Sequence, residues 1–176
     1  MKILLIGGSK SGKSMLAQTL CRRLAGDNPM YYWATMEPTD SEDRARIENH
    51  LLERDGWGFE TVECGRELPR AIPQLAKDST VLFDSLTALL ANEMFGETMD
   101  EHAAARALRG IRALGAAAKH LVCVCDNLWC DGEDYGEWTE HYRAGLAHIC
   151  RSLAAEYDTV CEVTAGTPHC YKGTLL

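Results

Sequence analysis

The segment that most constrains the fold of this chain is GGSKSGKS, residues 7–14, which follows the short apolar run KILLI at residues 2–6. It fits the pattern G-x-x-x-x-G-K-[ST], in which a glycine-rich loop holds phosphate groups. The apolar run ending in glycines predicts a buried parallel strand, and a helical pattern follows over residues 13–25. Strand, loop and helix in this order predict a nucleotide-binding protein.

The chemistry expected of this loop follows from its residue types. Glycines let the backbone wrap a phosphate with several N–H groups pointing inward, and the N-terminus of the following helix adds partial positive charge. Lys13 can reach the outer phosphates, and the Ser14 hydroxyl can bind Mg²⁺. The nucleotide-binding residues predicted here are Gly7, Gly8, Ser9, Lys10, Ser11, Gly12, Lys13 and Ser14.

Strand and helix patterns alternate along the rest of the chain. This alternation predicts one α/β domain over residues 1–176, a P-loop NTPase of RecA-like type with helices on both faces of a mostly parallel sheet. Further strands are expected at 30–35, 59–63, 79–84, 120–125 and 159–165, and helices at 66–77, 86–118 with a break near 96–100, and 138–157, before a short tail.

Composition excludes some classes of protein. The net charge of −8 argues against a nucleic-acid binder. The apolar runs are too short to span a bilayer and no signal-peptide pattern is present, so a cytoplasmic location is expected. The eight cysteines are therefore expected to be free thiols. Cys123 and Cys125, in an apolar run, are interpreted as small buried hydrophobic residues rather than metal ligands.

A second acid for the metal is expected at the end of the apolar run STVLFD. Asp84 there has the usual arrangement of a Walker B acid, which would hold Mg²⁺ together with Ser14. Asp84 could also cap the following helix, and the two roles are compatible.

The stretch RARIENHLLER, residues 44–54, places His50 four residues from both Arg46 and Arg54, so the three side chains can share one helix face. Nearby cations disfavour the imidazolium, which would leave His50 neutral and nucleophilic, and the arginines can hold phosphate oxygens. His50 is thus a candidate nucleophile for an α-phosphorus. An ordinary surface histidine on a charged helix remains the alternative.

Several segments together resemble a known family. GGSKSGKS, YWATMEPTDSEDRARIENHLLER, TVECGREL and VLFDSLTALLAN are similar to segments of the bifunctional adenosylcobinamide kinase / adenosylcobinamide-phosphate guanylyltransferase family of cobalamin biosynthesis. The R-I-x-x-H-x-x-x-R helix is the distinctive element, because generic P-loop proteins lack it. The similarity is close over residues 1–92 and looser over 142–173.

The resemblance implies two reactions. A nucleoside triphosphate, ATP or GTP, phosphorylates adenosylcobinamide, and GTP then guanylylates a histidine that passes GMP to adenosylcobinamide phosphate, giving adenosylcobinamide-GDP. The guanylylated histidine falls on His50, and a homotrimer is implied. Besides the phosphate loop and Arg46, the implied nucleotide contacts are Ala34, Thr35, Met36, Leu51, Leu52, Glu53, Arg54, Glu63 and Asp84.

The chain departs from the family pattern after the expected strand at 120–125. CDNLW, residues 125–129, stands where the family has S-N-E-V-G, so the acid and the glycine are lost at those positions. An acidic segment, CDGEDYGE, follows. Two alternatives therefore stay open: a P-loop kinase with only one of the two activities, and a GTP-binding regulatory protein that has lost catalysis.

Overall fold

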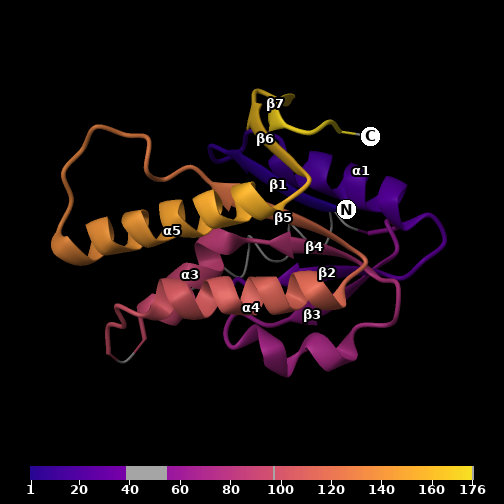
Figure 1. Ribbon diagram of the computed structural model, residues 1–176, viewed down its shortest axis with the longest axis horizontal. Helices are drawn as coiled ribbons and strands as arrows, with labels where there is room; N and C mark the ends of the chain where they lie inside the picture. The colour runs from indigo at the N-terminus through magenta and orange to yellow at the C-terminus, as the bar shows by residue number, and fades with distance from the viewer. Residues whose placement is uncertain (39–54, 97, 176) are drawn as a thin grey trace.

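The computed structural model describes residues 1–38, 55–96 and 98–175 (Figure 1). Within them a seven-stranded sheet has the order β3-β2-β4-β5-β1-β6-β7, and every pairing is parallel except that of β6 with β7. The strands are β1 (Lys2–Gly7), β2 (Met30–Ala34), β3 (Phe59–Glu63), β4 (Thr80–Asp84), β5 (His120–Asp126), β6 (Thr159–Thr164) and β7 (Thr167–Lys172).

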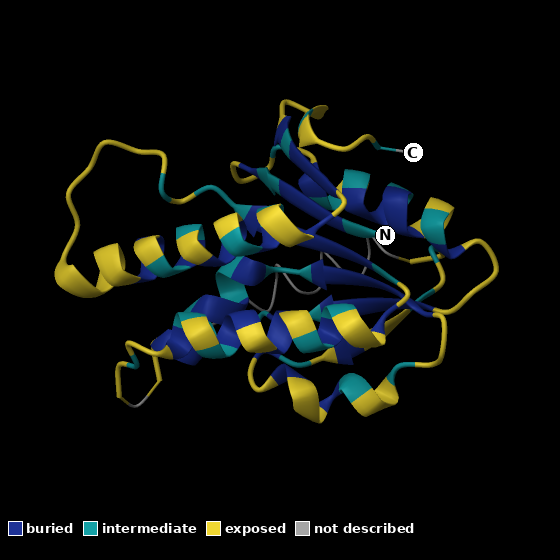
Figure 2. Ribbon diagram, viewed as in Figure 1, coloured by how far each residue is buried: buried dark blue, intermediate teal, exposed yellow. Residues whose placement is uncertain are grey.

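Helices cover both faces of the sheet, which gives three layers. The α-helices are α1 (Lys13–Ala25), α3 (Leu86–Met94), α4 (Ala103–Ala117) and α5 (Glu137–Glu156). Helix α1 packs on one face against side chains such as Ile3 and Val122, whereas α3, α4 and α5 pack together on the other face against Leu4 and Cys123. The central strands β1, β2, β4 and β5 are buried or half-buried along their whole length, whereas the outer strands β3 and β7 are largely exposed (Figure 2). The predicted α/β sandwich is confirmed.

Residues 66–77 do not form the expected helix. Two short 3₁₀ turns, η1 (Leu68–Arg70) and η2 (Ile72–Gln74), take its place. Each turn holds a proline in its first two positions, and a proline in a helix interior removes one backbone hydrogen bond and clashes with the preceding turn. Pro69 and Pro73 therefore limit the segment to separate turns. By contrast, the break expected near residues 96–100 does separate α3 from α4.

The chain after β6 was expected to be a tail, but it forms β7 and turns back along β6. The turn contains Ala165 and Gly166, both at positive φ. The antiparallel register sets Cys161 opposite Cys170, and the two sulfurs form a disulfide with the Cα atoms 4.0 Å apart. The expectation that all eight cysteines are free thiols is therefore wrong for this pair.

None of the helices in the described ranges combines the length and the apolar character that crossing a bilayer requires.

The disulfide predicts a measurable thiol count and a stability effect. Titration of the denatured, unreduced protein should find six reactive thiols, those of Cys21, Cys64, Cys123, Cys125, Cys130 and Cys150. Replacing Cys161 and Cys170 by serine should lower the free energy of unfolding by about 2–3 kcal/mol, because a cross-link of this loop length restricts the unfolded chain. Eight reactive thiols before any reduction would contradict the assignment.

Candidate functional site

The parallel topology gathers the ends of four central strands at one edge of the sheet. In the strand register Gly7 pairs with Asp126, and Asp84 pairs with both Val124 and Ala34. Carboxyl ends of parallel strands are where open α/β sheets bind ligands. The phosphate loop, Asp84 and the end of β2, which are far apart in the sequence, therefore lie at the same edge of the sheet.

The phosphate loop is closely packed at its start and tightly turned. A Cβ atom on Gly7 would lie well inside contact distance of the Val163 carbonyl oxygen, so only glycine fits there. Gly12 has a φ of 94°, which favours glycine as well. The β6–β7 turn supports the loop, because the Gly166 N–H donates to the Ser11 carbonyl at 2.8 Å.

Lys13 is the first residue of α1, and its side chain is only 6% exposed. Its ammonium group donates to the Gly8 carbonyl at 2.7 Å and lies 2.9 Å from the Asp126 carboxylate. A buried lysine is stable only when its charge is paired in this way. The ammonium is thus held against the backbone of the phosphate loop, where it is expected to bind the outer phosphates.

Asp126 was missed in the sequence. The family pattern has its acid at position 127, where this chain has Asn127, so the pattern predicts no acid here. The structure places a carboxylate one residue earlier, at the last position of β5 and in contact with Lys13. The signal that could have found it is the same as for Asp84, an acid that ends an apolar strand.

Asp84 ends β4 and is half-buried. Its carboxylate accepts a hydrogen bond from the Tyr32 hydroxyl at 2.7 Å. The alternative role as a helix cap is wrong, because Ser85 is the N-cap of α3 and accepts from the Ala88 N–H at 3.2 Å.

The predicted contacts Ala34, Thr35 and Met36 lie at the carboxyl end of β2. Thr35 is buried, and its hydroxyl accepts from the Ser85 N–H at 2.7 Å and donates to the Ser85 carbonyl at 3.0 Å. Asn92 donates to the Thr35 carbonyl at 2.7 Å. These bonds fix the strand end and engage the Thr35 hydroxyl, so a nucleotide would meet mainly the backbone here.

The remaining predicted residues lie either on the outer strand β3 or outside the described residues. Glu63 ends β3 and is exposed, at the outer strand of this side of the sheet. The other six lie in the segment 39–54, outside the described residues: Arg46, His50, Leu51, Leu52, Glu53 and Arg54.

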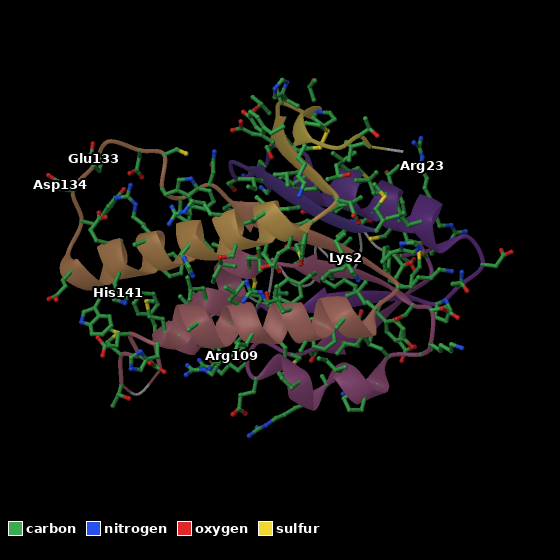
Figure 3. The ribbon with its side chains drawn as sticks, viewed as in Figure 1. Lys2, Arg23, Arg109, Glu133, Asp134 and His141 are labelled. Carbon is green, nitrogen blue, oxygen red and sulfur yellow. A yellow bond between two sulfur atoms is a disulfide. The ribbon has the colours of Figure 1, made fainter. Side chains whose placement is uncertain are left out.

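Arg143 fixes the acidic loop that follows β5. Its side chain is 10% exposed and donates to the carbonyls of Leu128 and Glu133 at 3.0 and 3.1 Å. The same guanidinium pairs with the carboxylates of Asp131 and Glu140 at 2.5 and 2.6 Å. Figure 3 shows that Glu133 lies on the outer part of the loop, away from the sheet. The loop is therefore ordered around one buried cation.

A pocket of about 180 Å³ lies beside this loop, where β1, β6 and β7 meet it. Most of its surface is apolar, and its one carboxylate, that of Glu162, accepts a hydrogen bond from the Tyr171 hydroxyl at 2.8 Å. Its lining residues are Ile6, Asn127, Trp129, Cys130, Val160, Cys161, Glu162 and Tyr171. Two of these adjoin Gly7 and Asp126 in the sequence, so the pocket borders the phosphate loop.

The cysteines of β5 are buried and pack as expected. Burial raises the pKa of the Cys123 thiol to about 12 and that of Cys125 well above its ordinary value. Cys150 on α5 lies with its sulfur 3.4 Å from that of Cys125. Thiols held protonated in this way make poor metal ligands. The described part of the chain contains no group of three or more His, Cys, Asp or Glu side chains arranged to hold a metal.

A protein-family model covers almost the whole chain. Residues 3–170 match the family model described as cobinamide kinase / cobinamide phosphate guanyltransferase. The chain belongs to this family. It is thus an enzyme of a kinase and guanylyltransferase family of cobalamin biosynthesis, with cobinamide compounds and nucleotides as its substrates. No curated protein matches the chain.

Solved structures show the same fold at low sequence identity. The flagellar accessory protein FlaH from Methanocaldococcus jannaschii has a TM-score of 0.53 and 18% identity, over 99% of this chain and 81% of that one. A second solved structure, an ATPase domain, has a TM-score of 0.53 and 8% identity, over 92% of this chain and 68% of that one. These similarities confirm the RecA-like P-loop fold.

The two neighbouring glycines of the loop allow a matched test of its packing. Gly7→Ala should lower the free energy of unfolding by about 1–3 kcal/mol, because its Cβ meets the backbone of β6. Gly8→Ala, where a Cβ has nothing within 4 Å, should change it by less than about 1 kcal/mol. Urea denaturation measures both, and equal losses for the two variants would contradict the packing described here.

Proposed function

We propose that this enzyme carries out both reactions of its family at the carboxyl edge of the sheet. In the first, a nucleoside triphosphate phosphorylates the aminopropanol hydroxyl of adenosylcobinamide. In the second, GTP guanylylates His50 with release of pyrophosphate, and GMP passes to adenosylcobinamide phosphate. The observation that carries the proposal is the buried Lys13 ammonium, held beneath a phosphate loop that two strand-end carboxylates flank.

Triphosphate binding follows from the charges at this edge. The backbone N–H groups at the start of α1 and the ammonium of Lys13 both favour an anion. Lys13 already has one carboxylate partner, Asp126, so phosphate oxygens can replace a carboxylate oxygen without exposing the charge to an apolar environment. Lys13 thus serves as the cation for the outer phosphates in both steps.

The oxygen ligands at this edge fit Mg²⁺. Ser14 offers a hydroxyl and Asp84 a carboxylate held by Tyr32, and Mg²⁺ is usually bound by one or two such groups together with substrate phosphates. We assign these two residues to the metal. When bound, the ion would neutralise charge on the phosphates. Holding Asp84 in place is then the contribution of Tyr32.

His50 is the proposed carrier of GMP. Its support is the sequence, in which Arg46 and Arg54 flank it at the spacing of one helix face and can hold phosphate oxygens. In the reaction an imidazole nitrogen forms a bond to the α-phosphorus, and the bond from that phosphorus to pyrophosphate breaks. The segment that contains His50 begins shortly after β2 reaches the carboxyl edge at Ala34.

The pocket beside the acidic loop is proposed to take part of the acceptor. Its volume of about 180 Å³ is below that of pockets for drug-sized ligands, so it would admit a side arm and not a corrin ring. The apolar lining suits aliphatic groups. The corrin itself would then lie outside, over the edge of the sheet.

Labelling with GTP tests the guanylyltransferase step. Protein incubated with α-³²P-labelled GTP and Mg²⁺ should retain label after denaturation, and the bond should be acid-labile and base-stable, as a phosphoramidate is. His50→Ala should abolish the label, whereas His102→Ala, at a side chain 83% exposed, should keep it. If the wild type takes up no label but still phosphorylates adenosylcobinamide, the enzyme is a kinase with only one of the two activities. If it binds GTP but catalyses neither reaction, the GTP-binding regulatory protein is favoured.

Lys13→Ala should impair both reactions by about 10²- to 10³-fold, because it removes a charge that both triphosphates need. The matched control is Lys77→Ala, an exposed lysine just before β4 at the opposite edge of the sheet. Initial rates of phosphorylation and of histidine labelling measure the effect. Normal labelling in Lys13→Ala would show that GTP uses a second site.

A further inference from the structure

Asp126 is held by its backbone at the centre of the site. Its N–H donates to the Thr87 hydroxyl at 3.0 Å, and the N–H of Asn127 donates to the Gly7 carbonyl at 3.3 Å. These bonds tie the end of β5 to α3 on one side and to the start of the phosphate loop on the other. The backbone that carries the Asp126 carboxylate is therefore fixed next to the phosphate loop.

The side chain of Asp126 contacts the phosphate-binding machinery and also faces solvent. One carboxylate oxygen lies 2.9 Å from the Lys13 ammonium, while the side chain as a whole is 32% exposed. The other two strand-end acids at this edge are less suited to meet an acceptor. Asp84 is bonded to Tyr32 and assigned to the metal, and Glu63 lies on the outermost strand.

Nucleotide binding changes the charge around this carboxylate. Before binding, Asp126 is the counter-ion of Lys13. Once the outer phosphates engage the ammonium, Asp126 is left beside phosphate oxygens of like charge. A carboxylate that has lost its cation partner is available to accept a hydrogen bond from a hydroxyl group. A triphosphate bound at Lys13 would thus leave the Asp126 carboxylate without its partner, on the side where the outer phosphates are expected.

We propose that Asp126 is the general base of the kinase reaction, an inference that rests on the proposed function. The acceptor hydroxyl loses its proton to the Asp126 carboxylate while its oxygen forms a bond to the γ-phosphorus. The bond from that phosphorus to the bridging oxygen breaks, and the nucleoside diphosphate leaves with the electron pair. This assigns a role to the last residue of β5, where the acid stands one residue earlier than in the family pattern.

The test compares Asp126→Asn with the wild type on adenosylcobinamide and a γ-³²P-labelled triphosphate. The amide has the shape of the carboxylate but cannot take up the proton. The kcat of phosphorylation should fall by about 10²- to 10⁴-fold. The dissociation constant of a non-hydrolysable triphosphate should stay equal or fall, because Lys13 is no longer paired with a competing carboxylate.

Two further variants complete the experiment. Asp126→Glu keeps a carboxylate and should recover at least about tenfold of the lost rate. Asp134→Asn removes an exposed acid from the outer part of the acidic loop between β5 and α5, and this variant should behave as the wild type (Figure 3).

Each other outcome overturns the inference. A kcat within about threefold of the wild type would show that no base acts at this position. Recovery of the rate by raised Mg²⁺ would make Asp126 a metal ligand, and loss of nucleotide binding would make its role structural. A wild type that binds nucleotide but never phosphorylates adenosylcobinamide would refute the proposed kinase function itself, and the inference with it.

Discussion

The ion pair between Lys13 and Asp126 is the interaction on which the rest of the site depends. A lysine ammonium at 6% exposure needs a partner of opposite charge, and the register of β1 with β5 supplies one by setting Asp126 beside Gly7. The pair joins the first turn of α1 to the end of a central strand. The Lys13 ammonium also neutralises negative charge at this edge of the sheet, as a triphosphate site requires.

The elements around this pair act mainly as supports. The β6–β7 turn holds the phosphate loop through Gly166, and its disulfide closes the hairpin behind it. Thr35 and Ser85 bond to each other across the ends of β2 and β4, and Arg143 orders the loop after β5. All of these bonds join protein groups to one another. They fix strand ends, so that the groups that meet the substrate have defined positions.

Local chemistry made much of this structure predictable from the sequence. The strand–loop–helix order at residues 2–25, the buried strands and the position of Asp84 at the end of a strand each follow from a few consecutive residues. Features that depend on residues far apart were missed, since β7 exists only by pairing with β6, and the cysteine pair only through that register. Asp126 was missed for a related reason, because its partner, Lys13, lies 113 positions away in the sequence, the difference between 126 and 13. The helix expected over residues 66–77 is wrong for a local reason, because Pro69 and Pro73 limit the segment to two short turns.

When a triphosphate binds, its oxygens should replace the Asp126 carboxylate as the partner of the Lys13 ammonium. A crystal structure with Mg²⁺ and a non-hydrolysable GTP analogue tests it directly. Phosphate oxygens should lie within hydrogen-bond distance of the Lys13 ammonium, and the Asp126 carboxylate should be separated from it and face the γ-phosphate. An intact Lys13–Asp126 pair, with the phosphates bound elsewhere on the molecule, would contradict it.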